Sequence, residues 1–343
     1  IRASKRKASS PTSCSALAST AAFTTGGALQ LSFLSPTLAR VTLVPAQGFR
    51  ESHTWAIAQG FSSELPWAGR PRNALNGFER PALSLSQAEG LTTLSTDRLS
   101  VSLQGGGNSP LRLHWVDAAS GKTVLEDRPT SAYLQERRTG LVRHCVVRDP
   151  REHYFGLGDK TGELNLHGRR LRCLGQDSIG YDPERGDPLY KHWPFVLTRA
   201  ASGHWYGLYY DTLCACTFDL GCEHDNYHEL FRYVEIDDGE LDYYLMTGSN
   251  PGEVMAQFVK LIGGTHLPPR GSLGYAQTAM GLADAPDVPA AVPVEISTLQ
   301  TRHFLLPETD GAARRMIGRD DDISIIGSGT WPVPAIETGS SGG

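Results

Sequence analysis

Between residues 28 and 247 the sequence is a succession of short runs in which apolar and polar residues alternate, and this pattern restricts the fold more than any other feature. A period of two is typical of half-buried β-strands. Gly, Pro, Asn and Asp separate the runs, for example at residues 105–107, 120–121 and 238–239. Many short strands without an intervening helix favour a mainly β fold, an antiparallel β-sandwich. The predicted strands are residues 28–35, 39–45, 54–59, 98–104, 111–117, 140–148, 194–200, 204–211, 214–220, 230–237 and 240–248.

The first helix is predicted only after this region, in NPGEVMAQFVKLIGG, residues 250–264. Asn250 is a good N-cap residue, and Glu253 is placed to complete a capping box. Pro251 suits the first helical position. Val254, Phe258 and Leu261 fall on one stripe at helical spacing, so this face is expected to be buried.

Composition excludes several classes of function. The chain has 343 residues, 40% of them hydrophobic and 20% charged, with a formal net charge of −5. Without a long basic run, nucleic acid is not an expected partner. No window approaches the ~20 apolar residues that a membrane-spanning helix needs, so no membrane contact is expected. Six cysteines without a secretory signal favour reduced thiols and a cytoplasmic location.

Both ends of the chain differ in character from the strand-rich region. Basic residues and small polar residues dominate positions 1–27, which are expected to form a disordered leader. GSLGYAQTAM, residues 271–280, is predicted to be a further strand. Residues 283–343 keep neither periodicity for long and are expected to be a poorly ordered tail, in which FLLP and ISIIG are candidates for isolated strands.

One segment, DSIGYDPERGDPLYKHWPF from Asp177 to Phe195, is too rich in aromatic residues and prolines for simple disorder. Long irregular segments inside compact domains are usually functional when they are ordered. We therefore expect this segment to be presented to a ligand or to another domain.

Several ordered blocks of the sequence resemble glycoside hydrolase family 31, the family of α-glucosidases and α-xylosidases. These blocks are HYFGLGDKTG, GYDPERGDPLYKHWPF, the strand with Asp-Tyr-Tyr, the helix with P-x-E, and PPRGSLGY. The resemblance extends from about residue 28 to 282. It implies that residues 28–249 form the N-terminal β-sandwich, similar in fold to galactose mutarotase. Residues 250–282 would then be a linker helix and the first strand of a (β/α)8 barrel.

The resemblance also implies roles for particular residues and partners. Asp182, in Tyr181-Asp182-Pro183, stands where family members use an aspartate to hydrogen-bond sugar hydroxyls, and Tyr181 would line the same pocket. The sandwich surface is expected to pack on a catalytic barrel, with an α-glycoside as the substrate of the complete enzyme. No cofactor and no metal are expected.

The catalytic residues of the family are not recognisable in this chain. Hydrolysis with retention requires two carboxylates ~5–5.5 Å apart, which the family supplies from barrel blocks such as W-x-D-M-N-E. No such block occurs here, and the sequence after Ser272 is far shorter than the ~250 residues of a barrel. We therefore expect the chain to be inactive alone. A truncated reading frame, a frameshift near residue 287 and a mispredicted gene all remain open explanations.

Two other functions remain open. The sandwich could be a free-standing carbohydrate-binding or structural module, which requires a complete pocket of its own. A mutarotase-like epimerase would instead need a general acid and base that converge, with His144 or His153 beside Glu235 as candidates.

Plain structural roles compete with binding within the Asp177 to Phe195 segment. Its three aspartates are also typical turn formers, and Tyr181 is compatible with either role. Packing on the sandwich is expected for its last two aromatic residues, Trp193 and Phe195. The three aspartates are Asp177, Asp182 and Asp187.

Two further motifs have ordinary interpretations. Gly156-Leu157-Gly158 fits no phosphate-binding motif and is predicted to form a tight turn, with Lys160 paired to Asp159. The cysteines and histidines between residues 214 and 228 do not match zinc-site spacing, so buried thiols and surface histidines are the favoured interpretation. These residues are Cys214, Cys216, Cys222, His224 and His228.

Overall fold

The structure is a computed structural model, and it divides into two compact units, residues 1–265 and 266–343. Each unit is described by itself. The residues that the structure describes are 19–22, 28–45, 48–58, 68–88, 90–106, 109–136, 138–223, 230–265, 270, 295–297, 302–306, 314–319 and 322–328.

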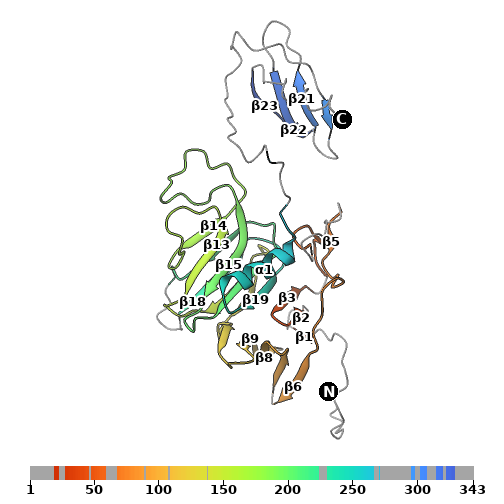
Figure 1. Cartoon of the computed structure of the whole chain (residues 1–343), viewed down its shortest axis with the longest axis vertical. Coiled ribbons are helices and arrows are strands. Elements are labelled where there is room, and N and C mark those ends of the chain that lie inside the picture. Colours follow the sequence, from red (N-terminus) through yellow and green to blue (C-terminus); the bar gives the residue numbers. More distant parts are fainter. Residues whose placement is uncertain are drawn as a thin grey trace. The chain divides into compact units, whose positions relative to one another are not determined.

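Antiparallel sheets make up the first unit (Figure 1), and the largest has seven strands in the order β1-β2-β3-β19-β16-β15-β13. Its strands are β1 (Ser19–Ala22), β2 (Ala28–Ser35), β3 (Leu38–Val44), β13 (His153–Gly158), β15 (His192–Arg199), β16 (Trp205–Tyr210) and β19 (Asp242–Gly248).

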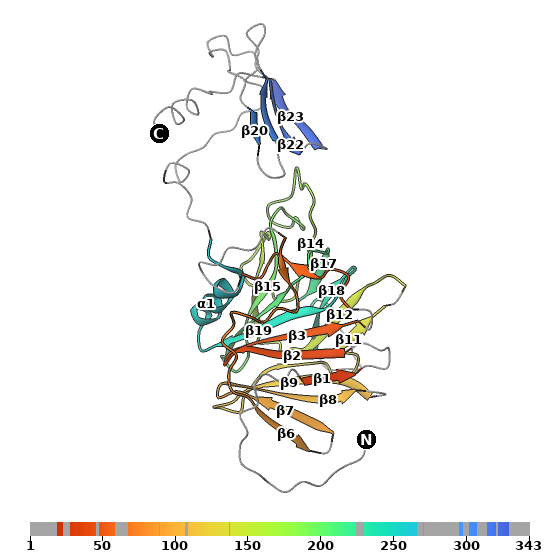
Figure 2. The ribbon, with the colours of Figure 1, turned by 90° about the vertical axis from the view of Figure 1, so that its right-hand side faces the viewer.

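Two five-stranded sheets and one short pair complete the first unit, and Figure 2 shows the strands β6 to β9 as a layer separate from β2 and β3. The β6–β10 sheet contains β6 (Ser84–Ala88), β7 (Leu91–Ser95), β8 (Leu99–Gly106), β9 (Ser109–Asp117) and β10 (Thr123–Glu126). The second, with the order β11-β12-β18-β17-β14, contains β11 (Tyr133–Gln135), β12 (Val142–Val147), β14 (Arg170–Cys173), β17 (Cys216–Asp219) and β18 (Phe231–Ile236). β4 (His53–Thr54) pairs with β5 (Arg70–Pro71).

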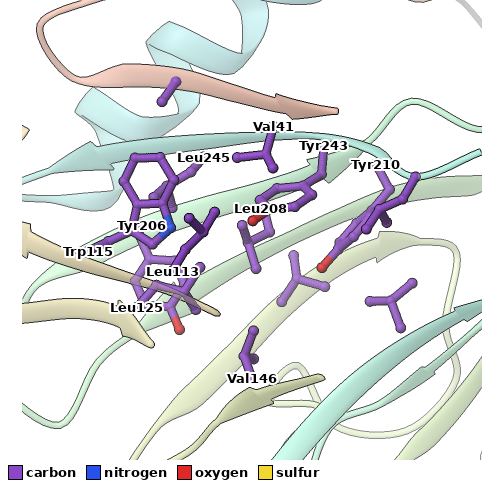
Figure 3. Packing of buried hydrophobic residues seen from close by; sticks show 14 of the residues in the cluster. Val41, Leu113, Trp115, Leu125, Val146, Tyr206, Leu208, Tyr210, Tyr243 and Leu245 are labelled. Atoms are coloured by element: carbon purple, nitrogen blue, oxygen red, sulfur yellow. The ribbon is translucent and has the colours of Figure 1, made fainter. Parts of the chain in front are cut away.

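The main core lies between the seven-stranded sheet and the two five-stranded sheets. Figure 3 shows Trp115 and Leu125 of the β6–β10 sheet in one cluster with Tyr206 and Leu208 of the seven-stranded sheet. Full burial of an aliphatic or aromatic side chain contributes ~1.5–3 kcal/mol. Packing of opposed sheets in this way defines a β-sandwich, so the predicted antiparallel β-sandwich is confirmed, while the barrel strand after it stays a prediction.

The opposite face of the seven-stranded sheet is covered by α1 (Pro251–Ile262). The side chain of Asn250 accepts a hydrogen bond from the backbone N–H of Glu253 at 3.0 Å, and the helix ends at Gly263. Val254, Phe258 and Leu261 are buried, so the predicted cap and buried stripe are confirmed. Because the seven-stranded sheet is covered on both faces, all seven residues of β19 are buried.

A cluster of buried charged side chains holds residues 48–58 and 68–78 against this face of the seven-stranded sheet. Arg40 donates from Nε and Nη2 to the two carboxylate oxygens of Asp242, at 2.8 and 2.6 Å. Arg72 donates from Nη1 to Asp242 Oδ2 at 3.0 Å and to Asp211 Oδ2 at 3.2 Å. The Thr54 hydroxyl donates to Asp211 Oδ1 at 2.9 Å. These contacts join β3, β19 and the end of β16 to a segment that has little sheet pairing of its own.

Two local expectations are wrong. Residues 55–58 do not form a strand, because Ile57 and Ala58 pack beneath α1, where the backbone N–H of Ala58 donates to Leu261 O at 2.9 Å; residue 59 lies outside the described residues. Gly156 to Gly158 are not a turn between strands but an irregularity in the pairing of β13 with β15. A Cβ at Gly158 would lie 2.3 Å from the carbonyl oxygen of Lys191, and this close approach explains the glycine.

Residues 266–343 form the second unit, which contains one four-stranded antiparallel sheet. FLLP and ISIIG, expected as isolated strands, instead pair with neighbours. The predicted strand at residues 271–280 lies outside the described residues, and the boundaries at 27, 249 and 282 stay predictions. In the part of the chain that the structure describes, no helix has the length and apolar character needed to cross a membrane. The four strands are β20 (Glu295–Ser297), β21 (Arg302–Leu306), β22 (Arg314–Arg319) and β23 (Asp322–Ser328).

Candidate functional site

The segment between β14 and β15, residues 174–191, is the loop singled out by the sequence, and it extends beyond the ends of these strands (Figure 1). Asp187 anchors its base. Oδ1 of Asp187 accepts from Lys160 Nζ at 2.8 Å, and Oδ2 accepts from the backbone N–H of Arg172 at 2.5 Å. Lys160 also donates to Arg172 O at 2.6 Å, and its side chain is only 3% exposed. The predicted pairing of Lys160 with Asp159 is therefore wrong, and Asp187 is an ion-pair partner rather than only a turn former.

Two hydroxyl groups and a tight turn hold the rest of the loop. Thr161 Oγ1 donates to Gly186 O and Ser178 Oγ donates to Pro188 O, each at 2.8 Å. The backbone N–H of Gly186 donates to Asp182 O at 2.7 Å. A Cβ on Gly186 would also lie 2.7 Å from Asp182 O, so only glycine allows the chain to close here. The tip, residues 182–186, is thus a defined turn on a fixed base.

Asp182 lies exposed at this tip. Its Oδ1 accepts a hydrogen bond from the backbone N–H of Glu184 at 2.8 Å, the short-range contact that aspartate makes in turns. Among the residues that the structure describes, no donor is bonded to Oδ2 of Asp182. The carboxylate therefore forms the turn with one oxygen and presents the other to the surroundings. Its sugar-binding role stays a prediction.

Aromatic residues precede and follow Asp182 in the loop and at the start of β15. The rings of Tyr181 and Tyr190 meet edge to face with centroids 6.4 Å apart, and both are about half exposed. Phe195 is buried and stacks on Phe258 at 4.0 Å, as expected for a packing residue. Trp193 is 53% exposed and its ring lies 6.5 Å from that of Phe258, so it packs on one residue of α1 and is otherwise open. Ile179 is also strongly exposed, so three large side chains of the loop, Ile179, Tyr181 and Tyr190, are uncovered.

The alternative epimerase residues do not converge. His144 is buried, with Nδ1 2.9 Å from the hydroxyl of Tyr210 and Nε2 3.0 Å from Asp127 Oδ1. Glu235 is paired in register with Arg143, so it points to the opposite face of the sheet from His144. His153 belongs to β13 of another sheet. The candidate acid and base thus lie on different surfaces.

The cysteines form no metal site with their neighbours. Cys216 is buried on β17, directly opposite Cys173 of β14, whereas Cys214 and Cys222 are exposed. No group of three or more His, Cys, Asp or Glu residues suited to a metal ion occurs among the described residues. His224 and His228 of the original cluster lie outside them.

Sequence reasoning missed a second polar region at the far end of β15. Glu152 and Tyr206 are buried there beside a cavity of about 680 Å³. Burial raises the pKa of the Glu152 carboxyl, an effect that the nearby Arg232 opposes. The lining residues come from three segments between positions 122 and 206, and no motif connects them.

Comparison with known proteins agrees with this fold. The family model described as the glycosyl hydrolase 31 N-terminal galactose mutarotase-like domain matches residues 28–219. Alpha-glucosidase 2 of Bacillus thermoamyloliquefaciens is 29% identical over 201 residues, which are 58% of this chain and 24% of that protein. Alpha-xylosidase XylQ of Lactiplantibacillus pentosus is 24% identical over 220 residues, which are 62% of this chain and 26% of that protein. This chain therefore spans about a quarter of the length of these relatives.

Solved structures show the same architecture. A glycoside hydrolase family 31 dextranase of Flavobacterium johnsoniae, in complex with isomaltotriose, superposes with a TM-score of 0.60 at 20% identity. The match covers 74% of this chain and 28% of the dextranase. Because the family model covers more than half of the chain, and the sandwich has the corresponding fold, this chain belongs to glycoside hydrolase family 31 and carries its N-terminal galactose mutarotase-like domain.

Proposed function

We propose that this sandwich works as the non-catalytic N-terminal part of an enzyme that hydrolyses α-glycosidic bonds. Family membership supports this proposal, since the relatives include proteins named alpha-glucosidase and alpha-xylosidase. Within that enzyme, the loop 174–191 borders the sugar pocket of a (β/α)8 barrel. Residues 28–249 would form the sandwich, and residues 250–282 would lead from it into the barrel.

The observation that carries this proposal is the open carboxylate of Asp182 on an anchored loop. Oδ2 of Asp182 has no donor among the described residues, while the base of the loop is fixed by Lys160 and Asp187. A carboxylate that accepts from sugar hydroxyls forms charge-assisted hydrogen bonds, which are about twice as strong as neutral ones. Tyr181, the adjacent residue, would supply the wall of the pocket.

Exposed apolar side chains of the loop and of β15 support a packing role. Ile179 of the loop is 83% exposed, and Trp193, in β15 directly after the loop, is 53% exposed. A large apolar side chain that is left exposed is available to pack on a partner. The barrel is the partner that the family provides, with Ile179 and Trp193 at its edge.

The experiment that tests this proposal starts with the reading frame. Sequencing of the transcript across and beyond the codons for Met280 to Gly343 is expected to reveal a barrel with a W-x-D-M-N-E-like block. The product of that frame is then assayed with p-nitrophenyl α-glucoside and α-xyloside. A stop codon directly after Gly343, confirmed in the transcript, would contradict the enzymatic role and leave a binding module.

A variant then tests the loop. In the active enzyme, Asp182→Asn is expected to lower kcat/KM by about 10- to 100-fold, since a charged hydrogen bond contributes ~1.5–3 kcal/mol. Asp177→Asn in the same loop is the matched control and should change kcat/KM less than about twofold. Equal effects of the two substitutions would rule out a specific role for Asp182.

A cytoplasmic location is part of the same proposal. Cys173 and Cys216 face each other across β14 and β17 and are free thiols, which suits a reducing compartment. Alkylation of the protein directly in cell extracts, followed by peptide mapping, is expected to label both as thiols after unfolding. Recovery of the pair as a disulfide would contradict that location.

A further inference from the structure

A cavity opens where the edge strand β10 approaches the segment 147–152 and the hairpin turn at residues 200–203. Its volume is about 680 Å³, within the range of ~300–1,000 Å³ typical of small-molecule sites. The eight residues of β15 separate it from the Asp182 loop, which corresponds to about 23 Å along the strand. It is therefore distinct from the candidate site described above. The lining side chains that matter chemically are Lys122, Leu125, Arg148, Glu152, Ser202 and Tyr206.

The buried lining of this cavity contains a hydrogen-bond acceptor and a hydrogen-bond donor. Glu152 is 8% exposed, and its Oε2 accepts from the hydroxyl of Tyr154 at 2.6 Å. Its Oε1 is bonded to no donor among the residues described. The hydroxyl of Tyr206 accepts from Nη2 of Arg232 at 2.9 Å and can donate its own proton onward. The lining of the cavity thus includes a carboxylate acceptor and a hydroxyl group that can donate.

Two buried donors that contact lining residues, but do not line the cavity themselves, lack partners within the described structure. They are Nε of Arg232, whose guanidinium lies over the rings of Tyr154 and Tyr206, and Nε1 of Trp115. Trp115 pairs across from Leu125, a residue of the cavity wall. Buried polar groups without partners are rare in folded proteins, so bound water is expected next to these two donors, behind the lining residues.

The charges around the cavity balance, which argues against an anionic ligand. Arg148 donates to the carbonyl oxygens of Phe231 and Gly221 and is committed to the backbone. Arg151 is bonded to both carboxylate oxygens of Asp149. The lining contains three cations and three acids: Lys122, Arg148, Arg151, Glu126, Asp149 and Glu152.

We propose that this cavity is a second carbohydrate site, which binds a neutral monosaccharide or disaccharide through its hydroxyl groups. Each sugar hydroxyl both donates and accepts, so the hydroxyls of one sugar can donate to Glu152 Oε1 and accept from the Tyr206 hydroxyl. The apolar wall at Val124 and Leu125 suits the carbon face of a sugar ring. The inference stands apart from the role of Asp182, because it uses none of the residues of that loop.

The test is a titration of the full 343-residue chain with methyl α-D-glucopyranoside and with maltose, followed by isothermal calorimetry or by amide chemical shifts. Saturable binding in the millimolar range is expected for one of the two sugars. Glu152→Gln should weaken it at least fivefold. Ala201→Trp, in the turn at the mouth of the cavity, should abolish it by filling the space without altering the core. Melting curves and circular dichroism verify that both variants are folded.

Matched controls separate this site from the loop. Leu164→Ala and Leu213→Ala, at two exposed positions outside the cavity and outside the loop, should leave the sugar affinity unchanged within about twofold. Absence of saturable binding of both sugars, or unchanged binding by Ala201→Trp, would overturn the proposal. So would competition by inorganic phosphate, which would identify an anion site. Loss of affinity in Asp182→Asn alone would assign the binding to the loop instead.

Discussion

Asp182 and Asp242 illustrate two uses of the same side chain within one domain. Asp242, 1% exposed, receives donors from Arg40, Arg72 and Thr42, so both of its oxygens are occupied. Asp182 is exposed and accepts one backbone N–H with one oxygen. A carboxylate has room for about four hydrogen bonds. The difference indicates which aspartate holds the fold and which one remains available to a ligand.

The largest loss of stability is expected when the buried Asp242 is replaced. Asp242→Asn leaves Arg40 and Arg72 without their shared negative partner in the protein interior. Removal of one partner from a buried ion pair costs ~3–5 kcal/mol in the free energy of unfolding. Urea denaturation measures it, with Asp182→Asn as the control of equal chemistry on the surface. A loss below about 1 kcal/mol would show that the cluster contributes little.

The same cluster should make stability depend on pH. Burial raises the pKa of the Asp211 carboxyl to about 6, and Asp242 adds to the rise, while Arg72 opposes it. In the unfolded chain this carboxyl titrates near 3.8. Between these values the folded protein holds a proton that the unfolded chain has released, so stability falls as the pH rises from about 4 to about 6. A shift of this size amounts to roughly 3 kcal/mol.

The measurement compares wild type and Asp211→Asn by urea denaturation at about pH 4 and about pH 7. Because asparagine stays neutral, the variant should gain stability relative to wild type as the pH rises through this window. Other carboxyl groups titrate in both proteins and cancel in the difference. A difference that does not change with pH would contradict the raised pKa.

An intermediate loss of stability is expected when the ion pair at the base of the loop 174–191 is removed. Asp187→Asn deprives the buried ammonium of Lys160 of its carboxylate, at an expected cost of ~2 kcal/mol. Because Asp187 also bonds the backbone of Arg172, limited proteolysis should cut residues 174–191 faster in the variant. Asp177→Asn, in the same loop, is the control. Equal cleavage rates for the two variants would show that the ion pair does not anchor the loop.

The elements that sequence could predict are those with a purely local signal. ALQLSFLS alternates from Leu29 to Phe33, and it coincides with β2 (Ala28–Ser35). The helix Pro251–Ile262 follows from its cap and its buried stripe. By contrast, β6 (Ser84–Ala88) is exposed at all five positions, so no alternation marks it. The run around Ile57 is apolar because it packs beneath α1, a tertiary reason that no local pattern contains.

In the candidate site, too, some residues could be predicted from a local sequence pattern and others could not. Asp182 and Tyr181 were recognisable because they lie within one continuous family motif. The ion pair of Lys160 with Asp187 spans 27 positions, and the geometry that selects Asp187 over the adjacent Asp159 exists only after folding. The cavity beside Glu152 assembles three distant segments, so its residues carry no joint signal in the sequence.

The smallest expected effect on stability is the one that separates the two roles of Asp182. Asparagine retains Oδ1, so Asp182→Asn keeps the bond from the Glu184 N–H and should change stability by no more than ~0.5 kcal/mol. Asp182→Ala removes that bond as well and should cost ~0.5–1.5 kcal/mol. Thermal unfolding of both variants gives the comparison. If the asparagine variant were as unstable as the alanine variant, the charge itself would hold the loop, and Asp182 would resemble Asp242 rather than a ligand-binding residue. If it is as stable as wild type, any loss of function in the same variant must come from the interaction of the carboxylate with its substrate.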